Sequence, residues 1–161
     1  MHRYMTTTTK SIWEIMTKKL ETIVTSSSAQ EAAKKMRDKN VSSLLVIDNN
    51  NNSKPIGIVT ERDLVRKVCV NDASSKHTAV QEITSSPLVT IDAISSVEVA
   101  ADIMIQNKVR HLLVVEDEDA NRPLGIITPG DFTDYLKENL NTDDVNSKII
   151  ESIKEGQEEN K

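Results

Sequence analysis

The sequence is poor in aromatic residues, glycine and proline, and it contains a single cysteine. Because aromatic residues make up 2% and hydrophobic residues 37% of the 161 positions, a core must be built from Ile, Val, Leu, Met and Ala. Cys69 cannot form an internal disulfide, which favours a reducing compartment, and we interpret it as a small apolar side chain in a helix. The four glycines form no phosphate-cradling loop, so we identify no P-loop.

Long apolar runs are absent as well. None approaches the roughly 20 residues that a membrane-spanning helix needs, and the N-terminus lacks the apolar stretch of a secretory signal. The net charge of −5 argues against a nucleic-acid-binding protein, although it does not exclude a local basic pocket for a phosphate. His2 and His77 lie in polar stretches without the spacing of metal ligands. We therefore expect a soluble, cytoplasmic protein that binds neither nucleic acid nor membrane and has no metal site.

An internal repeat is the most informative feature of the sequence. Residues 11–68 align with residues 79–136 without a gap. Many aligned positions are identical, among them Ile15 and Ile83, Ala32 and Ala100, Met36 and Met104, Gly57 and Gly125, and Asp63 and Asp131. Two long copies indicate a duplicated domain rather than a solenoid, which usually needs three or more repeats.

Each copy predicts the same order of elements. In the first copy, a short apolar segment (11–16) precedes a strand (20–24), a helix (28–39), two strands (43–47 and 55–59) and a helix that begins at Thr60. Ser28 and Glu31 have the spacing of a capping box, and Leu64, Val65 and Val68 are expected on one face of the last helix. The second copy predicts strands at 88–91, 112–115 and 123–127 and helices at 95–106 and 128–136.

These patterns predict an α+β fold: two tandem β-α-β-β-α units packed sheet to sheet with pseudo-twofold symmetry, because neither copy alone buries much apolar surface. We expect a flexible N-terminal tail (1–10), a first unit (11–70), a linker (71–78), a second unit (79–138) and a C-terminal segment (139–161). In that last segment Val145, Ile149, Ile150 and Ile153 fit one helical stripe. A helix with this stripe could pack on the module itself or on a second copy, could bind another protein, or could be only marginally ordered. Residues 155–161 are polar, and we expect them to be disordered.

A motif after the last strand of each copy carries a family resemblance. It reads Gly57-Ile58-Val59-Thr60-Glu61-Arg62-Asp63 in the first copy and Gly125-Ile126-Ile127-Thr128-Pro129-Gly130-Asp131 in the second. With the Ala-Ala-x-x-Met helix and the Leu-Leu-Val strand, it resembles the cystathionine-β-synthase (CBS) domain over about residues 11–137. The resemblance implies a paired, or Bateman, module that forms a homodimer. It also implies a sensor of an adenosine-containing ligand, AMP, ADP, ATP or S-adenosylmethionine, with no cofactor required for activity.

By the same resemblance, the ligand lies in clefts between the copies. In the first cleft, Thr60 and Asp63 would hold the ribose, and Arg110 and His111 the phosphate. Leu88, Val89 and Val109 would line the base. An ionised Asp can accept two hydrogen bonds from a diol, and Arg offers donors that match phosphate oxygens. His111 adds charge only when protonated, which predicts pH-dependent affinity.

The second cleft would contain Thr128 and Asp131. Its positions equivalent to Arg110 and His111 are Ser42 and Ser43, which are neutral. We therefore expect this cleft to be empty or to accept only the nucleoside part of a ligand.

Simpler interpretations of the same residues remain open. Thr60 with Asp63, and Thr128 with Asp131, also fit a helix N-cap and an acidic residue in the first turn. Gly57 and Gly125 are compatible with a close approach of two strands as well as with clearance for a ligand. Adjacent strand residues face opposite ways, so one of Arg110 and His111 is expected to miss the cleft. The charged residues after Thr60, namely Glu61, Arg62, Arg66 and Lys67, are interpreted as a solvated helix face, some of which crosses a dimer interface.

The sequence thus predicts a stand-alone regulatory module that binds an adenosine-containing ligand and acts in trans on an unidentified protein target. The alternative is a structural protein-interaction module without a bound nucleotide, its clefts filled by side chains. An enzyme is disfavoured, because we identify no nucleophile elbow and because Asp63 and Asp131 belong to separate clefts.

Overall fold

The computed structural model describes residues 10–85, 87–139 and 144–158. The first copy forms α1 (Ile12–Ile15), β1 (Thr22–Val24), α2 (Ala29–Lys39), β2 (Ser43–Asp48), β3 (Lys54–Thr60), α3 (Glu61–Asp63) and the π-helix η1 (Leu64–Cys69). The second forms α4 (Val80–Ile83), β4 (Thr90–Asp92), α5 (Val97–Asn107), β5 (Leu112–Glu116), β6 (Asp119–Ile127) and α6 (Pro129–Asn139), followed by α7 (Asp144–Glu158).

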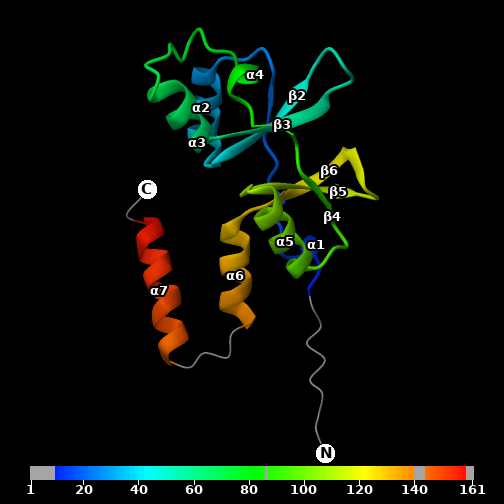
Figure 1. Cartoon of the computed structure of the whole chain (residues 1–161), viewed down its shortest axis with the longest axis vertical. Helices are drawn as coiled ribbons and strands as arrows, with labels where there is room; N and C mark the ends of the chain where they lie inside the picture. The colour runs from blue at the N-terminus through cyan, green and yellow to red at the C-terminus, as the bar shows by residue number, and fades with distance from the viewer. Residues whose placement is uncertain (1–9, 86, 140–143, 159–161) are drawn as a thin grey trace, which may run out of the picture.

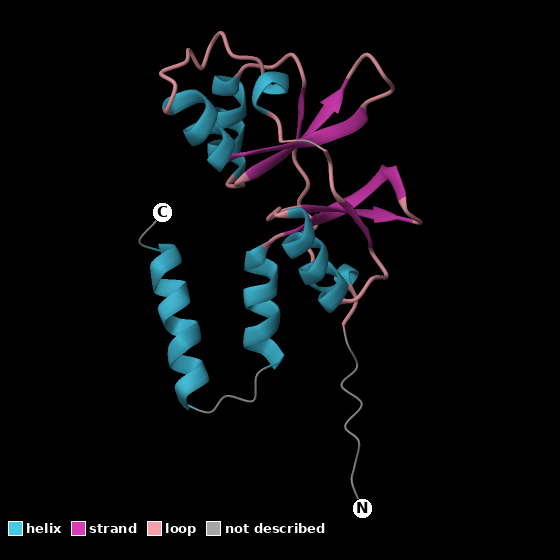
Figure 2. Cartoon of the chain, in the orientation of Figure 1, coloured by secondary structure: helices cyan, strands magenta, loops and turns pink. Residues whose placement is uncertain are grey.

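Each copy contributes one three-stranded sheet. The strand orders are β1-β2-β3 and β4-β5-β6, and in both sheets the first pair is parallel and the second antiparallel. The sheets face each other through a shared apolar cluster: Leu45, Ile58, Leu113, Val115 and Ile126. Figure 2 shows both sheets at the middle of the molecule with the helices outside them. The predicted α+β fold with sheet-to-sheet packing is confirmed.

The leading helix of each copy packs on the other copy. Ile12 of α1 is fully buried in a cluster with Ile91 and Leu112 of the second sheet. Val80 and Ile83 of α4 are buried in the cluster of the first sheet. The residues after these helices pair with a strand edge there, Thr17 with Ile126 and Ser85 with Ile58. The two sequence copies are therefore interlocked, and each spatial unit contains a helix from the other repeat.

This exchange explains the two motif glycines. A Cβ on Gly57 would lie 2.4 Å from Thr84 Cγ2 and 2.8 Å from the Ser85 carbonyl oxygen. A Cβ on Gly125 would lie 2.5 Å from the Thr17 carbonyl oxygen. All three distances are shorter than an ordinary van der Waals contact. The segment that follows each exchanged helix, Thr17 after α1 and Thr84 with Ser85 after α4, can therefore cross the strand only at a glycine.

Two details of the first copy test the helix predictions. The capping box of α2 is confirmed, because the Glu31 N–H donates to Ser28 Oγ and the Ser28 N–H donates to the Glu31 carboxylate. The expectation that Val65 shares the buried face is wrong: Val68 is buried and Val65 is 56% exposed. Leu64 and Val68, four residues apart, already occupy the face toward the core, and Val65 lies about 100° further round the helix.

The C-terminal stripe forms a helix, α7, that lies beside α6 (Figure 1). Ile150 is buried, whereas Ile149 and Ile153 are about half-exposed. Helix α7 continues to Glu158, beyond the point where polar composition predicts disorder to begin, because Glu, Lys and Gln favour helix. The side chain of Val145, the tail at 1–9 and residues 159–161 lie outside the described part. No helix among the described residues is long and apolar enough to cross a membrane.

Candidate functional site

A cleft of about 590 Å³ lies between the two copies. Its wall comes from the end of β3 and the helix that follows, the segment between α4 and β4, and the residues before β5. All residues predicted for the first cleft lie on this wall: Thr60, Asp63, Leu88, Val89, Val109, Arg110 and His111. Helix α5 ends with Lys108 in the left-handed conformation, and this turn directs the residues from 108 to 111 toward the cleft.

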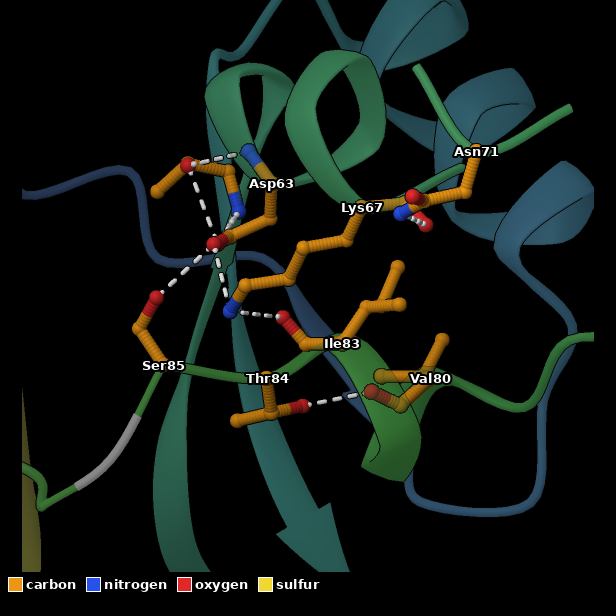
Figure 3. Close-up of polar contacts among 8 residues, drawn as sticks. Asp63, Lys67, Asn71, Val80, Ile83, Thr84 and Ser85 are labelled. Atoms are coloured by element: carbon orange, nitrogen blue, oxygen red, sulfur yellow. Dashed lines mark hydrogen bonds and ion pairs between the residues drawn. The ribbon is translucent and has the colours of Figure 1, made fainter. Parts of the chain in front are cut away.

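Asp63 is the buried charge of this site, with 6% of its surface exposed. Its Oδ2 accepts from the Thr60 N–H at 2.9 Å and the Thr60 hydroxyl at 3.0 Å. Its Oδ1 accepts from the Ser85 hydroxyl at 2.8 Å and lies 3.1 Å from Lys67 Nζ. Figure 3 shows Ser85 and Lys67 beside the Asp63 carboxylate. The capping interpretation of Thr60 and Asp63 is therefore correct, and it coexists with their place on the cleft wall.

Arg110 and His111 both reach the cleft, contrary to the expectation that one would miss it. The reason is that both residues precede β5, which begins at Leu112, so strand alternation does not apply to them. Burial lowers the pKa of His111 below its ordinary value, the Arg110 charge lowers it further, and the Asp63 carboxylate opposes both effects. Burial therefore favours the neutral form of His111.

The charge of this wall is unlike that of the whole chain. Five cationic residues line it, Arg62, Arg66, Lys67, Lys108 and Arg110, against the two acidic residues Glu61 and Asp63. The chain as a whole has a net charge of −5. An anionic ligand would therefore find a locally positive surface on an otherwise acidic protein.

Several wall residues were missed from the sequence. Arg62, Arg66 and Lys67 were interpreted as a solvated helix face or a dimer contact, yet they border the cleft. Lys67 lies four residues after Asp63, and this spacing on a helix indicates an ion pair that the sequence alone could have predicted. Ser85 could not be found in this way, because it reaches Asp63 only through the exchanged segment.

The second cleft is smaller and less charged. It measures about 200 Å³, and its wall includes Ser42, Ser43 and Thr128 but not Asp131. Its charged residues are Lys19 and Glu21. Asp131 instead accepts from the Thr17 hydroxyl and the Thr128 N–H, both at 2.8 Å. Burial raises the pKa of Asp131, and these hydrogen bonds oppose that effect.

No group of three or more His, Cys, Asp or Glu side chains among the described residues could hold a metal ion. Asp63 lies on the wall of the first cleft, whereas Asp131 lies on the wall of neither cleft, so the two carboxylates do not form a pair in one cleft.

Comparison with known proteins gives the family. The CBS domain family model matches residues 12–69 and 80–138. Among curated proteins, an uncharacterized protein of Methanopyrus kandleri is 34% identical over 79 residues, which are 49% of this chain and 39% of that protein. A mitochondrial CBS domain-containing protein of Arabidopsis thaliana is 36% identical over 77 residues, which are 47% of this chain and 36% of that protein. The chain thus matches less than half the length of either relative.

Solved structures match over most of the chain. A conserved protein of Pyrococcus horikoshii has a TM-score of 0.72 at 27% identity, covering 84% of this chain and 98% of that one. A putative signal-transduction protein with CBS domains from Burkholderia ambifaria has the same TM-score and identity, covering 84% and 99%. The hexameric CBS-CP12 protein of bloom-forming cyanobacteria has a TM-score of 0.72 at 29% identity, covering 92% and 81%. The chain belongs to the CBS-domain family and contains two CBS domains in tandem.

Proposed function

We propose that this CBS pair is a regulatory module that binds an adenine nucleotide in the first cleft and acts in trans on a protein target. The observation that carries the proposal is the convergence of Thr60, Asp63, Arg110 and His111, from both copies, on one cationic cleft. Its volume of about 590 Å³ lies within the roughly 300–1,000 Å³ typical of small-molecule sites.

The charge of the wall selects among adenosine-containing ligands. AMP, ADP and ATP carry phosphate, which pairs well with guanidinium and ammonium groups. S-adenosylmethionine carries a sulfonium, an ammonium and a carboxylate group, so its net charge is positive and a wall with five cationic side chains favours it less than a phosphate-bearing nucleotide. The apolar residues Leu88, Val89 and Val109 provide a surface for the base. We therefore favour a phosphate-bearing nucleotide over S-adenosylmethionine.

A ligand in this cleft would contact both copies. Thr60 and Asp63 follow the first sheet, whereas Arg110 and His111 precede the central strand of the second. A bound nucleotide would therefore favour the relative position of the sheets in which both sets of contacts are made. It can change a partner's affinity only through such a difference between two states. The hexameric state of the cyanobacterial CBS-CP12 protein supports self-association, and we propose a homodimer as the simplest assembly.

A structural interaction module without nucleotide is the second candidate. It is favoured by the three hydrogen bonds and the ion pair of the Asp63 carboxylate, which has protein partners without a ligand. The two candidates differ in their response to nucleotide.

A thermal-shift panel separates them, with AMP, ADP, ATP, S-adenosylmethionine and NAD added to purified protein. Ligand at about 100 times its Kd adds about 2.7 kcal/mol to the free energy of unfolding, which raises the Tm of a chain of this size by about 5–11 °C. We expect a rise with phosphate-bearing nucleotides that is smaller in Arg110→Ala and kept in Asp131→Ala. It should also be kept in Arg37→Ala, which changes an exposed arginine on α2 away from the cleft. Unchanged Tm with every ligand would favour the structural module.

A further inference from the structure

Lys67 lies beside the carboxylate of Asp63, the residue proposed to hold the ribose. Its Nζ lies 3.1 Å from Asp63 Oδ1 and donates to the Ile83 carbonyl oxygen at 3.0 Å. Figure 3 shows the ammonium group between η1, which carries Lys67, and the end of α4. Lys67 also lines the cleft, and 42% of its side chain is exposed.

Four contacts surround the Asp63 carboxylate. A carboxylate has about four lone-pair sites; three of them accept hydrogen bonds from the Thr60 N–H, the Thr60 hydroxyl and the Ser85 hydroxyl. The Lys67 ammonium lies beside Oδ1 as an ion pair at 3.1 Å. A ligand diol that donates to Asp63 would therefore compete with one of these groups.

The donors differ in how easily they can leave. Both Thr60 contacts belong to the cap of the helix that follows. Ser85 is held beside β3 by backbone hydrogen bonds with Ile58 at 3.1 and 3.5 Å. Lys67 is attached through a flexible, partly exposed stem. Lys67 is therefore the donor that a ribose would displace.

The motif aspartate of the second copy has no lysine at the equivalent position. Asp131 has the equivalents of the other donors, since Thr17 and Thr128 donate to it. The residue equivalent to Lys67 is Tyr135, which carries no ammonium group. The ion pair with the motif aspartate thus belongs to the first cleft, the one with the cationic wall.

We infer that Lys67 is a specificity-determining residue that makes the first cleft favour nucleotides over nucleosides. A nucleoside displaces the ammonium group from Asp63 and offers it nothing in return. A nucleotide displaces it as well but supplies a phosphate with which the ammonium can pair. The inference rests on nucleotide binding in this cleft, as proposed above.

The test is calorimetric titration of adenosine and AMP into the full chain and into Lys67→Met. The variant removes the competing ammonium, so adenosine should bind on the order of fivefold tighter, the scale of one partly exposed ion pair. AMP should gain less than adenosine, because the variant also loses a phosphate partner. The ratio of AMP to adenosine affinity should therefore fall.

Two further variants complete the design. Lys34→Met makes the same change of charge at an exposed position of α2 away from the cleft and should leave both affinities unchanged. Lys67→Gln is neutral but keeps an N–H donor for the Ile83 carbonyl, and it should reproduce Lys67→Met even if the methionine variant folds poorly.

Adenosine affinity that stays the same or weakens in both Lys67 variants, with AMP still bound by the unmodified chain, would overturn the role of Lys67 and leave nucleotide binding intact. Absence of AMP binding to the unmodified chain and to every variant would overturn both.

Discussion

Gly57→Ala should destabilise the fold through one defined clash. The added Cβ would lie 2.4 Å from Thr84 Cγ2 and 2.8 Å from the Ser85 carbonyl oxygen. Neither neighbour is free to move. The Thr84 hydroxyl donates to the Val80 carbonyl at 2.7 Å, which fixes its rotamer, and the Ser85 backbone is bonded to Ile58.

The free energy of unfolding should fall by about 1–3 kcal/mol, the usual cost of adding a methyl group where a structure has no room for it. For a chain of this size it corresponds to a fall in Tm of about 2–12 °C. Relief of the clash would also move Ser85 away from Asp63, to which it donates at 2.8 Å. Nucleotide affinity should therefore decrease in the same variant.

The other glycines provide matched controls, measured by thermal and urea melts. At Gly130, in α6, the nearest atom to an added Cβ is Thr128 Oγ1 at 3.5 Å, and at Gly156, in α7, none lies within 4 Å. Alanine in a helix is about 0.5–1 kcal/mol more favourable than glycine, so both variants should be neutral or stabilised. If Gly57→Ala were as stable as the Gly130→Ala and Gly156→Ala variants, the close approach of the segment after α4 to Gly57 would be refuted.

Three smaller predictions follow from the cap, the core and the cleft. Ser28→Ala removes the N-cap of α2 and should lower the free energy of unfolding by about 0.5–2 kcal/mol in urea melts, with an unchanged m-value. Leu113→Ala removes a fully buried side chain between the sheets and should cost about 2–5 kcal/mol, seen as a lower Tm. His111 has a lowered pKa when folded, so the unfolded chain binds its proton more readily. Its contribution to stability is therefore present above the ordinary pKa of 6.5 and is lost as the pH falls toward the lower folded value. Urea melts from pH 7.5 to 5.5 should show a smaller loss in His111→Gln, and equal slopes would contradict this assignment.

The sequence predicted the fold because its signals are local and occur twice. Ser28 with Glu31 marks the start of α2. The apolar run at 44–46 marks the central strand β2, and all three of its side chains are buried. The motif ending in Asp63 recurs with Asp131 at one spacing, which made two related clefts predictable.

The exchange of the leading helices could not be predicted in the same way. Ile12 and Val80 are apolar in either arrangement, and nothing in their spacing indicates which sheet they cover. The exchange alone brings Ser85 to Asp63 and Thr17 to Asp131. The role of Lys67 also depends on it, because one of its partners, the Ile83 carbonyl, is on the exchanged helix α4.

The central claim is that one cleft of the pair binds an adenine nucleotide. Calorimetric titration of AMP into the unmodified chain, Arg110→Ala and Asp131→Ala tests it most directly, since it reports stoichiometry as well as affinity. We predict one site per chain, weakened in Arg110→Ala and unchanged in Asp131→Ala. Two equal sites per chain would contradict the difference between the clefts, and no heat of binding with AMP, ADP or ATP would contradict the sensor itself.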